Sequence, residues 1–347
     1  MAEFNFAKSL LAWHTNHGRH DLPWQHPRTA YRVWVSEIML QQTQVSTVIK
    51  YFDAFMLKFP TLNDLARSPS EQVMQLWAGL GYYSRARNMH QSAQICLVQF
   101  DAQLPKTFAE LMALPGIGRS TAGAILSQAY GLPFAILDGN VKRVLTRFHA
   151  IEGDSNSSAI QTQLWQHAES HLPSTKLANY TQALMDLGAT VCARSKPNCA
   201  NCPLTKHCQA LQSNSVADYP SKKARKTIPK RETHALILIS ESNEILLEQR
   251  PNHGIWGGLF SLPEVSDNEQ AKVFVKQFIK QSKNAVELSA ITHQFSHFQL
   301  TIKPSLWRNC ARKAQIRDNN QYQWIACNQL IQIGLPAPIK KLLQDLK

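Results

Sequence analysis

Two carboxylates in the first half of the chain occupy different predicted environments. Glu37 follows Trp34 by three residues and precedes Gln41 by four, so it shares the mostly apolar stripe of a predicted helix. Burial there raises the pKa of a carboxyl group and favours its neutral form. Asp138 precedes the helical pattern that begins at Val141, where an N-cap carboxylate accepts helix amides and stays ionised. A neutral acid opposite an anion is what glycosidic-bond cleavage requires. A core salt bridge for Glu37 and simple capping for Asp138 are the alternatives.

Four of the seven cysteines lie close together with the spacing Cys-x6-Cys-x2-Cys-x5-Cys. They are Cys192, Cys199, Cys202 and Cys208. In a chain without an export signal, such a cluster favours a metal site over disulfides. Four thiolates can enclose zinc or hold an iron–sulfur cluster, and their chemistry alone supports both. The intervening loops carry Arg194, Lys196, Lys206 and His207, which we expect to contact a phosphate backbone; a solvated loop is the alternative.

A glycine-containing turn, Leu114-Pro-Gly-Ile-Gly118, separates a helix predicted to end near Ala113 from one predicted to begin near Arg119. Gly116 and Gly118 allow a sharp turn with exposed amides. Together with the positive end of the next helix, these amides predict a binding site for a phosphate oxygen. An ordinary helix–helix turn is the alternative, but the small residues that follow favour close approach. This is the sequence form of the helix–hairpin–helix element of DNA-binding proteins.

The carboxylates and the glycine turn fall in a region of helical periodicity. Apolar residues at three- and four-residue spacings predict one amphipathic helix across residues 34–52. A capping box at residues 107–110 predicts the start of the helix before the glycine turn. Residues 160–172 and 176–190 predict two further helices. The first 210 residues therefore indicate an all-α domain.

The pattern changes after this region. Residues 219–231 carry six basic residues, two prolines and no acid, which predicts a charged linker that can also contact a DNA backbone. Residues 234–239 and 244–249 flank a short turn and predict a β-hairpin. Residues 269–281 predict a helix, and residues 298–307 and 323–325 predict strands. A smaller α+β domain therefore follows the helical one.

Length and composition limit the class of protein. A chain of 347 residues suggests about two domains. Its 44% hydrophobic and 18% charged residues indicate a folded protein. No apolar run approaches the ~18 residues of a membrane span, and the N-terminus lacks the features of a secretion signal. We therefore expect a cytoplasmic protein. The net charge of +13 suits a polyanionic partner.

Seven motifs occur in a characteristic order along the chain. They are Leu22-Pro-Trp-Gln25, Ser36-Glu-Ile-Met-Leu-Gln-Gln-Thr-Gln-Val45, Gly79-Leu-Gly-Tyr-Tyr-Ser-Arg-Ala-Arg87, Leu114-Pro-Gly-Ile-Gly-Arg-Ser-Thr-Ala-Gly123, Leu137-Asp-Gly-Asn-Val-Lys-Arg143, Met185-Asp-Leu-Gly-Ala189 and the four cysteines. The ordered set resembles the A/G-specific (MutY-type) adenine DNA glycosylase family, within the helix–hairpin–helix glycosylase superfamily. The resemblance covers essentially the whole chain.

The resemblance implies excision of undamaged adenine that is mispaired with 8-oxoguanine or guanine in double-stranded DNA. It implies that Glu37 is the general acid on adenine N7, that Asp138 stabilises the sugar cation, and that Asn140 helps to hold the reacting water. It also implies one 4Fe–4S cluster on the four cysteines. Gln42 and Tyr82 match positions that fill or wedge the duplex when the base leaves the stack. Trp24, Gln25 and Gln182 match the adenine pocket.

Ser120 distinguishes two enzyme classes. The related endonuclease III type carries at this position a lysine that attacks the sugar and cleaves the strand through a Schiff base. A serine hydroxyl cannot form an imine, so we expect monofunctional hydrolysis by water. A bifunctional glycosylase/lyase for pyrimidine lesions and a non-catalytic mismatch-binding protein are the alternatives. We assign no catalytic role to Lys142.

The C-terminal domain resembles the nudix fold. Trp256-Gly-Gly-Leu-Phe-Ser-Leu-Pro-Glu264 matches the first part of a nudix box, but residues 271–277 lack its glutamates. Without clustered carboxylates a divalent metal has no cage, so pyrophosphate hydrolysis is not expected. The family uses this domain to inspect the base opposite adenine, and Phe295, Ser296 and His297 match the loop that contacts 8-oxoguanine. An ordinary turn is the alternative.

The sequence thus predicts a multidomain chain. Residues 1–212 form an all-α helix–hairpin–helix glycosylase domain with an iron–sulfur cluster loop, residues 213–232 form a basic linker, and residues 233–347 form an α+β nudix-like domain. We expect a monomeric, nucleoid-associated DNA repair enzyme with no membrane partner.

Overall fold

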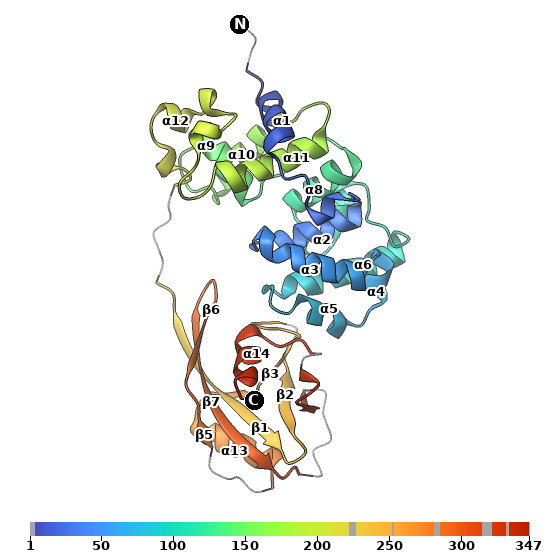
Figure 1. The fold of residues 1–347 in the computed structure, drawn as a ribbon, viewed down its shortest axis with the longest axis vertical. Coiled ribbons are helices and arrows are strands. Elements are labelled where there is room, and N and C mark those ends of the chain that lie inside the picture. Colours follow the sequence, from blue (N-terminus) through green and yellow to red (C-terminus); the bar gives the residue numbers. More distant parts are fainter. Residues whose placement is uncertain are drawn as a thin grey trace. The chain divides into compact units, whose positions relative to one another are not determined.

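The computed structural model describes residues 4–221, 227–251, 253–280, 285–313, 321–330 and 333–346. The chain forms two compact units (Figure 1). One unit comprises Met1–Arg67 and Asn88–Ala224, and the other comprises Ser68–Arg87 and Arg225–Lys347. The predicted linker lies partly outside the described residues, at positions 222–226, so the predicted domain boundaries stay a prediction. Within the described ranges, no helix has both the length and the apolar character to cross a bilayer.

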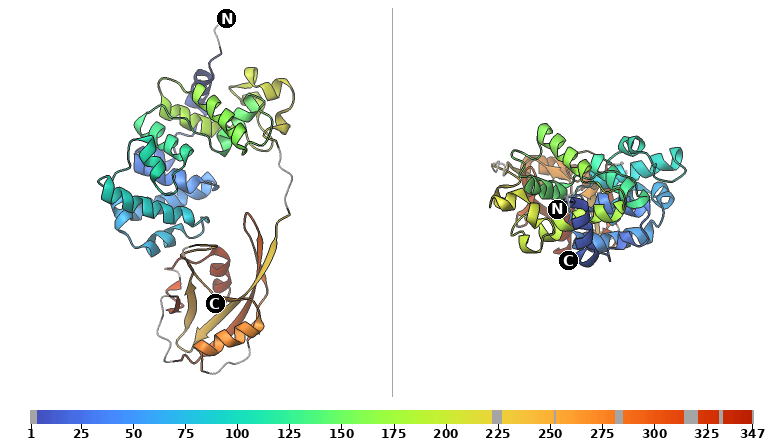
Figure 2. Two further views of the ribbon diagram at one scale, coloured as in Figure 1. Left: turned by 180° about the vertical axis from the view of Figure 1, so that it is seen from behind. Right: turned by 90° about the horizontal axis from the view of Figure 1, so that it is seen from above.

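The N-terminal part of the chain is helical, as predicted. Its α-helices are α1 (Phe6–His17), α2 (Ala30–Leu40), α3 (Val45–Lys58), α4 (Leu62–Arg67), α5 (Ser70–Trp77), α6 (Ser84–Gln99), α7 (Phe108–Ala113), α8 (Arg119–Tyr130), α9 (Gly139–Phe148), α10 (Ser158–Ser170), α11 (Leu177–Asp186) and α12 (Gln209–Gln212). Short 3-10 or π segments are η1 (Pro23–Gln25), η2 (Leu187–Val191), η3 (Cys199–Asn201), η4 (Thr205–His207) and η5 (Val216–Asp218). Helix α11 contacts α1, α8 and α9, and Figure 2 shows these helices from two further directions.

The single helix predicted across residues 34–52 is wrong. Helix α2 ends at Leu40, and α3 begins at Val45. Gln41 leaves the helical conformation with ψ 110°, and Gln42 has a positive φ of 57°, so the i to i−4 ladder breaks between them. Both halves bury apolar residues at helical spacing, which is why the sequence pattern continues through the break.

The other helix boundaries follow the local signals. Thr107 caps α7 by accepting a hydrogen bond from the amide of Glu110 at 3.3 Å, as the capping box predicts. The helix predicted over residues 160–172 is α10. The one predicted over 176–190 is α11, continued by the π-helical turn η2, which leads directly into Cys192.

One apolar core joins α1, α8, α9, α10 and α11 of the first unit. It contains Leu10 of α1, Ala124 of α8, Val141 and Leu145 of α9, and Leu184 of α11, all nearly inaccessible to solvent. Burial of such side chains is the main source of their stabilisation. This core fixes α8, α9 and α11 relative to one another, and these helices carry most of the candidate site.

The C-terminal part of the chain is an α+β fold built on a mixed sheet. Its strands are β1 (Lys230–Ser240), β2 (Glu244–Gln249), β3 (Phe260–Ser261), β4 (Glu264–Val265), β5 (Val286–Glu287), β6 (Ile291–Gln294), β7 (Gln299–Cys310) and β8 (Tyr322–Ala326). Their order is β3-β2-β1-β7-β5, while β4 pairs with β1, β6 with β7, and β8 with β2. The predicted hairpin is confirmed, because β1 and β2 pair antiparallel with Ile239 opposite Ile245.

Two helices accompany this sheet. Helix α13 (Asn268–Phe278) corresponds to the predicted helix, and its Ala271, Val275 and Phe278 pack with Leu236 and Leu238 of β1. Helix α14 (Ala337–Gln344) was not predicted. Strand β1 pairs in parallel with β7 over most of its length, so the long apolar run of β1 is buried in the middle of the sheet.

Candidate active site

Glu37 lies on α2 facing α8, among buried neighbours. Its Oε1 accepts a hydrogen bond from Gln128 Nε2 of α8 at 3.2 Å. Burial and, second, the negative charge of Asp138 raise the pKa of Glu37 to about 7, although the Gln128 hydrogen bond acts to lower it. The charge of Asp138 acts on the Glu37 carboxyl, which shows that the two residues lie in one site although they are far apart in the sequence. Glu37 is therefore poised to carry a proton near neutral pH, as the sequence predicts.

Asp138 is the N-cap of α9, as predicted. Its Oδ1 accepts a hydrogen bond from the amide of Val141 at 2.7 Å. Burial raises the pKa of Asp138 above its ordinary value, so the predicted ionised state of this carboxyl stays a prediction. The amides of Val141 and Asn140 and the charges of Arg143 and Lys142 act in the opposite sense. Asp138 is thus a half-buried carboxyl whose anionic form is favoured by local donors and cations.

Asn140 is held by Arg143 one helical turn later. Arg143 Nη2 donates to Asn140 Oδ1 at 2.9 Å and to the carbonyl of Gly188 at 2.6 Å. A Cβ at position 188 would lie 2.7 Å from the Cβ of Asn140, so only glycine allows η2 to approach this closely. The π-helical turn after α11 therefore packs against the first turn of α9 and fixes the Asn140 side chain beside Asp138.

Ser120 lies in the first turn of α8. Its Oγ accepts a hydrogen bond from the amide of Leu137 at 3.0 Å. The hydroxyl thus holds the segment that immediately precedes Asp138. This contact is a positioning role that the sequence did not indicate.

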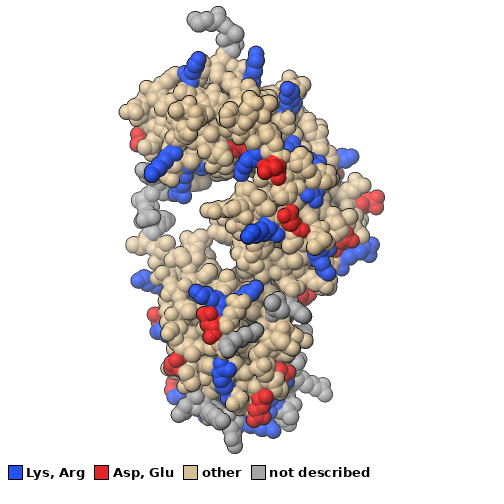
Figure 3. Space-filling view, viewed as in Figure 1, with Lys and Arg blue, Asp and Glu red and all other residues tan. Residues whose placement is uncertain are grey.

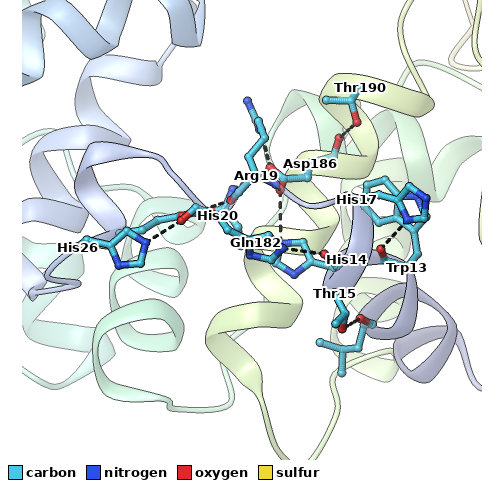
Figure 4. A network of polar contacts seen from close by, with 12 residues as sticks. Trp13, His14, Thr15, His17, Arg19, His20, His26, Gln182, Asp186 and Thr190 are labelled. Carbon is cyan, nitrogen blue, oxygen red and sulfur yellow. Dashed lines mark hydrogen bonds and ion pairs between the residues drawn. The ribbon is translucent and has the colours of Figure 1, made fainter.

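A buried polar network joins α1, the η1 segment and α11 (Figure 4). Gln25 Nε2 donates to the carbonyl of Arg19 at 3.1 Å, and Arg19 binds the Asp186 carboxylate through its amide and its guanidinium at 2.6–2.8 Å. Gln182 Nε2 donates to Asp186 Oδ1 at 2.8 Å, whereas its Oε1 is buried without a partner among the described residues. The network thus joins two of the three residues that the sequence assigns to the adenine pocket. The third, Trp24, is buried against Phe52 with ring centroids 5.5 Å apart.

Asp186 and Arg19 were missed at the sequence level. Burial acts to raise the pKa of Asp186, but the hydrogen bond from His14 and the charge of Arg19 outweigh it and hold this pKa below its ordinary value. The sequence feature that could have indicated this site is Asp186, the one acidic residue in the motif at residues 185–189. Asp186 fixes the orientation of Gln182, so it supports the pocket indirectly.

The two residues expected to contact the opened duplex share an unusual backbone conformation. Gln42 has φ 57° and Tyr82 has φ 47°, both in the left-handed region that non-glycine residues rarely adopt. The Tyr82 side chain is 45% exposed, and the Arg85 guanidinium lies 5.5 Å from its ring centroid. Each residue is presented by a sharp turn, Gln42 between α2 and α3, and Tyr82 before α6. Strain of this kind is common at binding sites.

The glycine turn is a helix–hairpin–helix element between α7 and α8. Gly116 has φ +80°, and a Cβ there would lie 2.9 Å from the Cβ of Asn88, so this position requires glycine on two grounds. Ile117 is buried and its amide donates to the carbonyl of Leu114 at 3.2 Å, which anchors the turn from inside. Gly118, the N-cap of α8, faces open space. A phosphate group can approach the helix start there.

The four cysteines line one cavity. Its volume is about 30 Å³, and its apolar walls include Val144, Phe148 and Leu187. In the described part of the chain, no three of these sulfurs lie within 4.8 Å of one another. A tetrahedral zinc site with Zn–S bonds of about 2.3 Å would bring its sulfurs to about 3.8 Å. The sulfur arrangement is therefore too open for one preformed zinc ion.

A buried cation lies beside this cavity. Arg147 is 4% exposed, and its Nη1 lies 3.3 Å from Cys192 Sγ and 2.8 Å from the carbonyl of Ala193. A buried guanidinium stabilises an anionic group nearby. Arg194 and Lys196, predicted to contact DNA, are exposed on the loop that leaves Cys192. Lysine and arginine side chains are also widespread on the molecular surface in Figure 3.

The segment predicted to recognise 8-oxoguanine is the turn between β6 and β7. Phe295 packs against Phe298 with ring centroids 4.6 Å apart and against Trp256 at 5.5 Å. Ser296 and His297 are exposed, with Ser296 Oγ 3.4 Å from His297 Nδ1. Phe295 therefore anchors the turn, and the two polar side chains are available to a partner. In the neighbouring nudix-like segment, Glu264 is paired with Arg250 at 3.3 Å instead of belonging to a carboxylate cluster.

Comparison with known proteins gives two family matches. A model described as HhH-GPD superfamily base excision DNA repair protein matches residues 35–170, and a NUDIX domain model matches residues 234–345. A solved thermostable thymine-DNA glycosylase covers 60% of this chain and 95% of its own, with 29% identity and a TM-score of 0.54. A non-covalent endonuclease III–DNA complex covers 60% and 94%, with 22% identity and a TM-score of 0.51, and shares the fold.

Full-length relatives are also similar. The adenine DNA glycosylase of Buchnera aphidicola subsp. Acyrthosiphon pisum is 39% identical over 347 residues, covering 100% of this chain and 99% of the relative. The adenine DNA glycosylase of Homo sapiens is 36% identical over 359 residues, covering 85% of this chain and 65% of the relative. With both domain types present in one chain and similarity along its whole length, the chain belongs to the adenine DNA glycosylase family, and it is a base excision repair glycosylase.

Proposed function

We propose that this enzyme hydrolyses the N-glycosidic bond of adenine that lies opposite 8-oxoguanine or guanine in double-stranded DNA, without cleaving the strand. The observation that carries the proposal is the coupled carboxyl pair. Glu37, with a pKa of about 7, supplies an acid at neutral pH. Burial raises the pKa of Asp138, but the Val141 amide and the Arg143 charge favour the anion that the proposal assigns to it. Glycosidic-bond cleavage through an oxocarbenium-like sugar needs both.

In the proposed reaction the adenine leaves the base stack and enters the pocket next to Glu37. Glu37 donates its proton to adenine N7, and the electron pair of the C1′–N9 bond moves to the base as the bond breaks. The Asp138 carboxylate stabilises the positive sugar. Water, held near Asn140, adds to C1′ and loses a proton to the carboxylate left on Glu37. The products are free adenine and an abasic site.

The surrounding residues support binding of the flipped base and its partner. The unpaired Oε1 of Gln182 can accept a hydrogen bond from the exocyclic amine of adenine, and Trp24 and Gln25 complete the pocket. Gln42 and Tyr82 enter the space that the base vacates. Gly116, Gly118, Arg194 and Lys196 contact phosphates. Ser296 and His297 hydrogen-bond the purine opposite adenine, on a turn anchored by Phe295.

A 4Fe–4S cluster on Cys192, Cys199, Cys202 and Cys208 is part of the proposal. The open sulfur arrangement and the buried Arg147 support it over a single zinc ion. Bound there, the cluster would supply a rigid cross-link for the loop that carries Arg194 and Lys196. Four iron and four sulfide per chain would support this assignment, whereas a colourless protein with zinc at the cysteines would contradict it.

We propose further that the enzyme is monomeric and acts on nucleoid DNA in the cytoplasm. Its basic surface suits this partner.

The test uses a duplex with one adenine opposite 8-oxoguanine. We expect strand breaks only after hot alkali, because hydrolysis by water leaves an intact abasic strand. Strand breaks without alkali, trapped as a covalent adduct by borohydride, would support the bifunctional alternative. Binding without any alkali-sensitive product would support a non-catalytic mismatch-binding protein. The same assay with guanine or cytosine opposite adenine measures mispair preference.

A further inference from the structure

A second group of metal-ligating side chains lies outside the carboxylate site and the cysteine cavity. His149, His167 and His171 each offer a ring nitrogen, and these nitrogens all lie within 4.8 Å of one another. Among the described residues this is the one group of three or more His, Cys, Asp or Glu side chains with ligand atoms so close together. Three imidazoles on one zinc ion, with Zn–N bonds of about 2.0–2.1 Å, have nitrogens about 3.4 Å apart. The three rings are stacked nearly parallel, so the imidazoles must rotate before their nitrogens converge on one ion.

The ends of two neighbouring helices, α9 and α10, bring these three rings together. His167 and His171 are four residues apart at the end of α10, so both project from one helix face, the spacing by which helical histidine pairs bind zinc. His149 is the C-cap of α9, which packs against α10. His149 Nε2 and His171 Nε2 are 2.9 Å apart. One pair on a helix and a third ligand from the neighbouring helix form a chelating set.

The three histidine rings contact one another and Phe6, and they are partly accessible to solvent. The His149 ring stacks on His167 with centroids 3.7 Å apart, and Phe6 stacks on His171 at 4.2 Å. All three histidines are only partly buried, so an ion can enter from solvent and keep a water ligand. Burial lowers the pKa of each imidazole, which agrees with the neutral form that metals bind.

We propose that His149, His167 and His171 bind one Zn²⁺ or a similar divalent transition-metal ion, with water in the remaining coordination position. The bound ion would join the end of α9 to the end of α10. This site is separate from the cysteine cavity in its ligands and does not depend on the proposed reaction. A hydrogen bond between two neutral histidines, with no metal affinity, is the competing explanation of the same contacts.

The test compares the holoenzyme with His167→Gln, since His167 can be changed without disturbing the Phe6 stacking. The matched control is His17→Gln, an exposed histidine on α1. Zn²⁺ alone is titrated by calorimetry, and thermal unfolding is measured with and without Zn²⁺. We expect one Zn²⁺ per chain in the wild type and in His17→Gln, together with a rise in Tm. His167→Gln should bind at least ~100-fold more weakly and show no rise, with unchanged iron content.

Two results would overturn the proposal. One is the absence of Zn²⁺ binding by the folded wild type. The other is equal binding by His167→Gln and the wild type, which would place the ion at the cysteines or elsewhere. His171→Gln provides a second variant if His167→Gln does not fold, with the same expected loss. Excision activity is not the readout, so failure here leaves the glycosylase proposal standing.

Discussion

At the scale of single residues, the proposed mechanism depends on the environment of Glu37. An exposed glutamate would be ionised at neutral pH and unable to donate a proton, whereas burial and the Asp138 charge raise the pKa of Glu37 to about 7. The sequence predicts this direction because Glu37 shares an apolar helix face. It does not predict the Gln128 partner, which lies 91 positions away and is brought in by the packing of α8 on α2.

We expect the single-turnover excision rate to fall as the pH rises above about 7, because Glu37 then loses the proton that the reaction needs. The same raised pKa affects stability. Neutral Glu37 favours the fold fully below its unfolded pKa, and this contribution is lost as the pH rises through about 7. Rates measured from pH 6 to pH 9 on one duplex test the first expectation. A rate that stays constant across this range would contradict it.

In the proposed mechanism, the Asp138 carboxylate supplies the negative charge that stabilises the sugar cation, in addition to capping α9. In Asp138→Asn the amide can still cap α9 through its oxygen, but it carries no negative charge for the sugar cation. We expect a loss of about 10²–10³-fold in single-turnover rate with little change in Tm. Circular dichroism melts and excision kinetics on the same preparation separate the two effects. A rate within a few-fold of the wild type would show that the carboxylate acts only as a cap.

At the scale of elements, the helix–hairpin–helix turn is the clearest match between pattern and structure. The capping box, the Leu-Pro-Gly-Ile-Gly sequence and the following helix are all local signals, and they give the correct boundaries of α7 and α8. The break between α2 and α3 is different. It comes from the backbone of Gln41 and Gln42, while the apolar spacing runs through it, so periodicity predicted one helix.

The two glycines of the turn provide a paired prediction. Gly116→Ala should destabilise the fold by about 1–3 kcal/mol, because of its positive φ and the close approach of Asn88. Gly118→Ala should leave the Tm nearly unchanged, because its φ is ordinary and the added Cβ meets open space. It should nevertheless weaken DNA binding about tenfold or more, because the added methyl group would obstruct the phosphate's approach to the exposed amides, and a hydrogen bond to a charged phosphate is worth about 1.5–3 kcal/mol.

Chemical denaturation and fluorescence anisotropy with duplex DNA test this pair. Equal affinity of Gly118→Ala and wild-type protein for DNA would remove Gly118 from the proposed phosphate contact.

At the scale of the whole molecule, the chain combines a helical unit that carries the carboxyl pair with a sheet unit that presents a polar turn. Sequence motifs predicted both folds, because each contains local patterns of sufficient length. They did not predict α14, the Arg19–Asp186 network or the approach of η2 to Asn140. The network and the approach of η2 depend on contacts between segments far apart in the chain, for which a single sequence carries no direct signal. Helix α14 does carry a local signal, because its buried Ile339, Leu342 and Leu343 have helical spacing.

The proposed contact of the turn between β6 and β7 with the base opposite adenine predicts an effect of this turn on mispair specificity. Replacing Ser296 and His297 together by alanine should reduce the preference for 8-oxoguanine over guanine opposite adenine, because two exposed hydrogen-bonding groups are lost while the Phe295 anchor stays. The chemical step should be less affected, since neither residue belongs to the carboxyl site. Single-turnover rates and affinities on both mispairs measure the effect. An equal loss on both would assign the turn a general role in DNA binding.

The most direct test of the central claim is the Glu37→Gln variant in single-turnover excision on adenine opposite 8-oxoguanine. Glutamine keeps the size and the hydrogen-bonding capacity of the side chain but cannot donate the proton of a carboxylic acid. We predict a loss of at least about 10²–10⁴-fold in rate, with binding to the mispaired duplex retained. Excision by Glu37→Gln at a rate near that of the wild type would contradict the proposed mechanism.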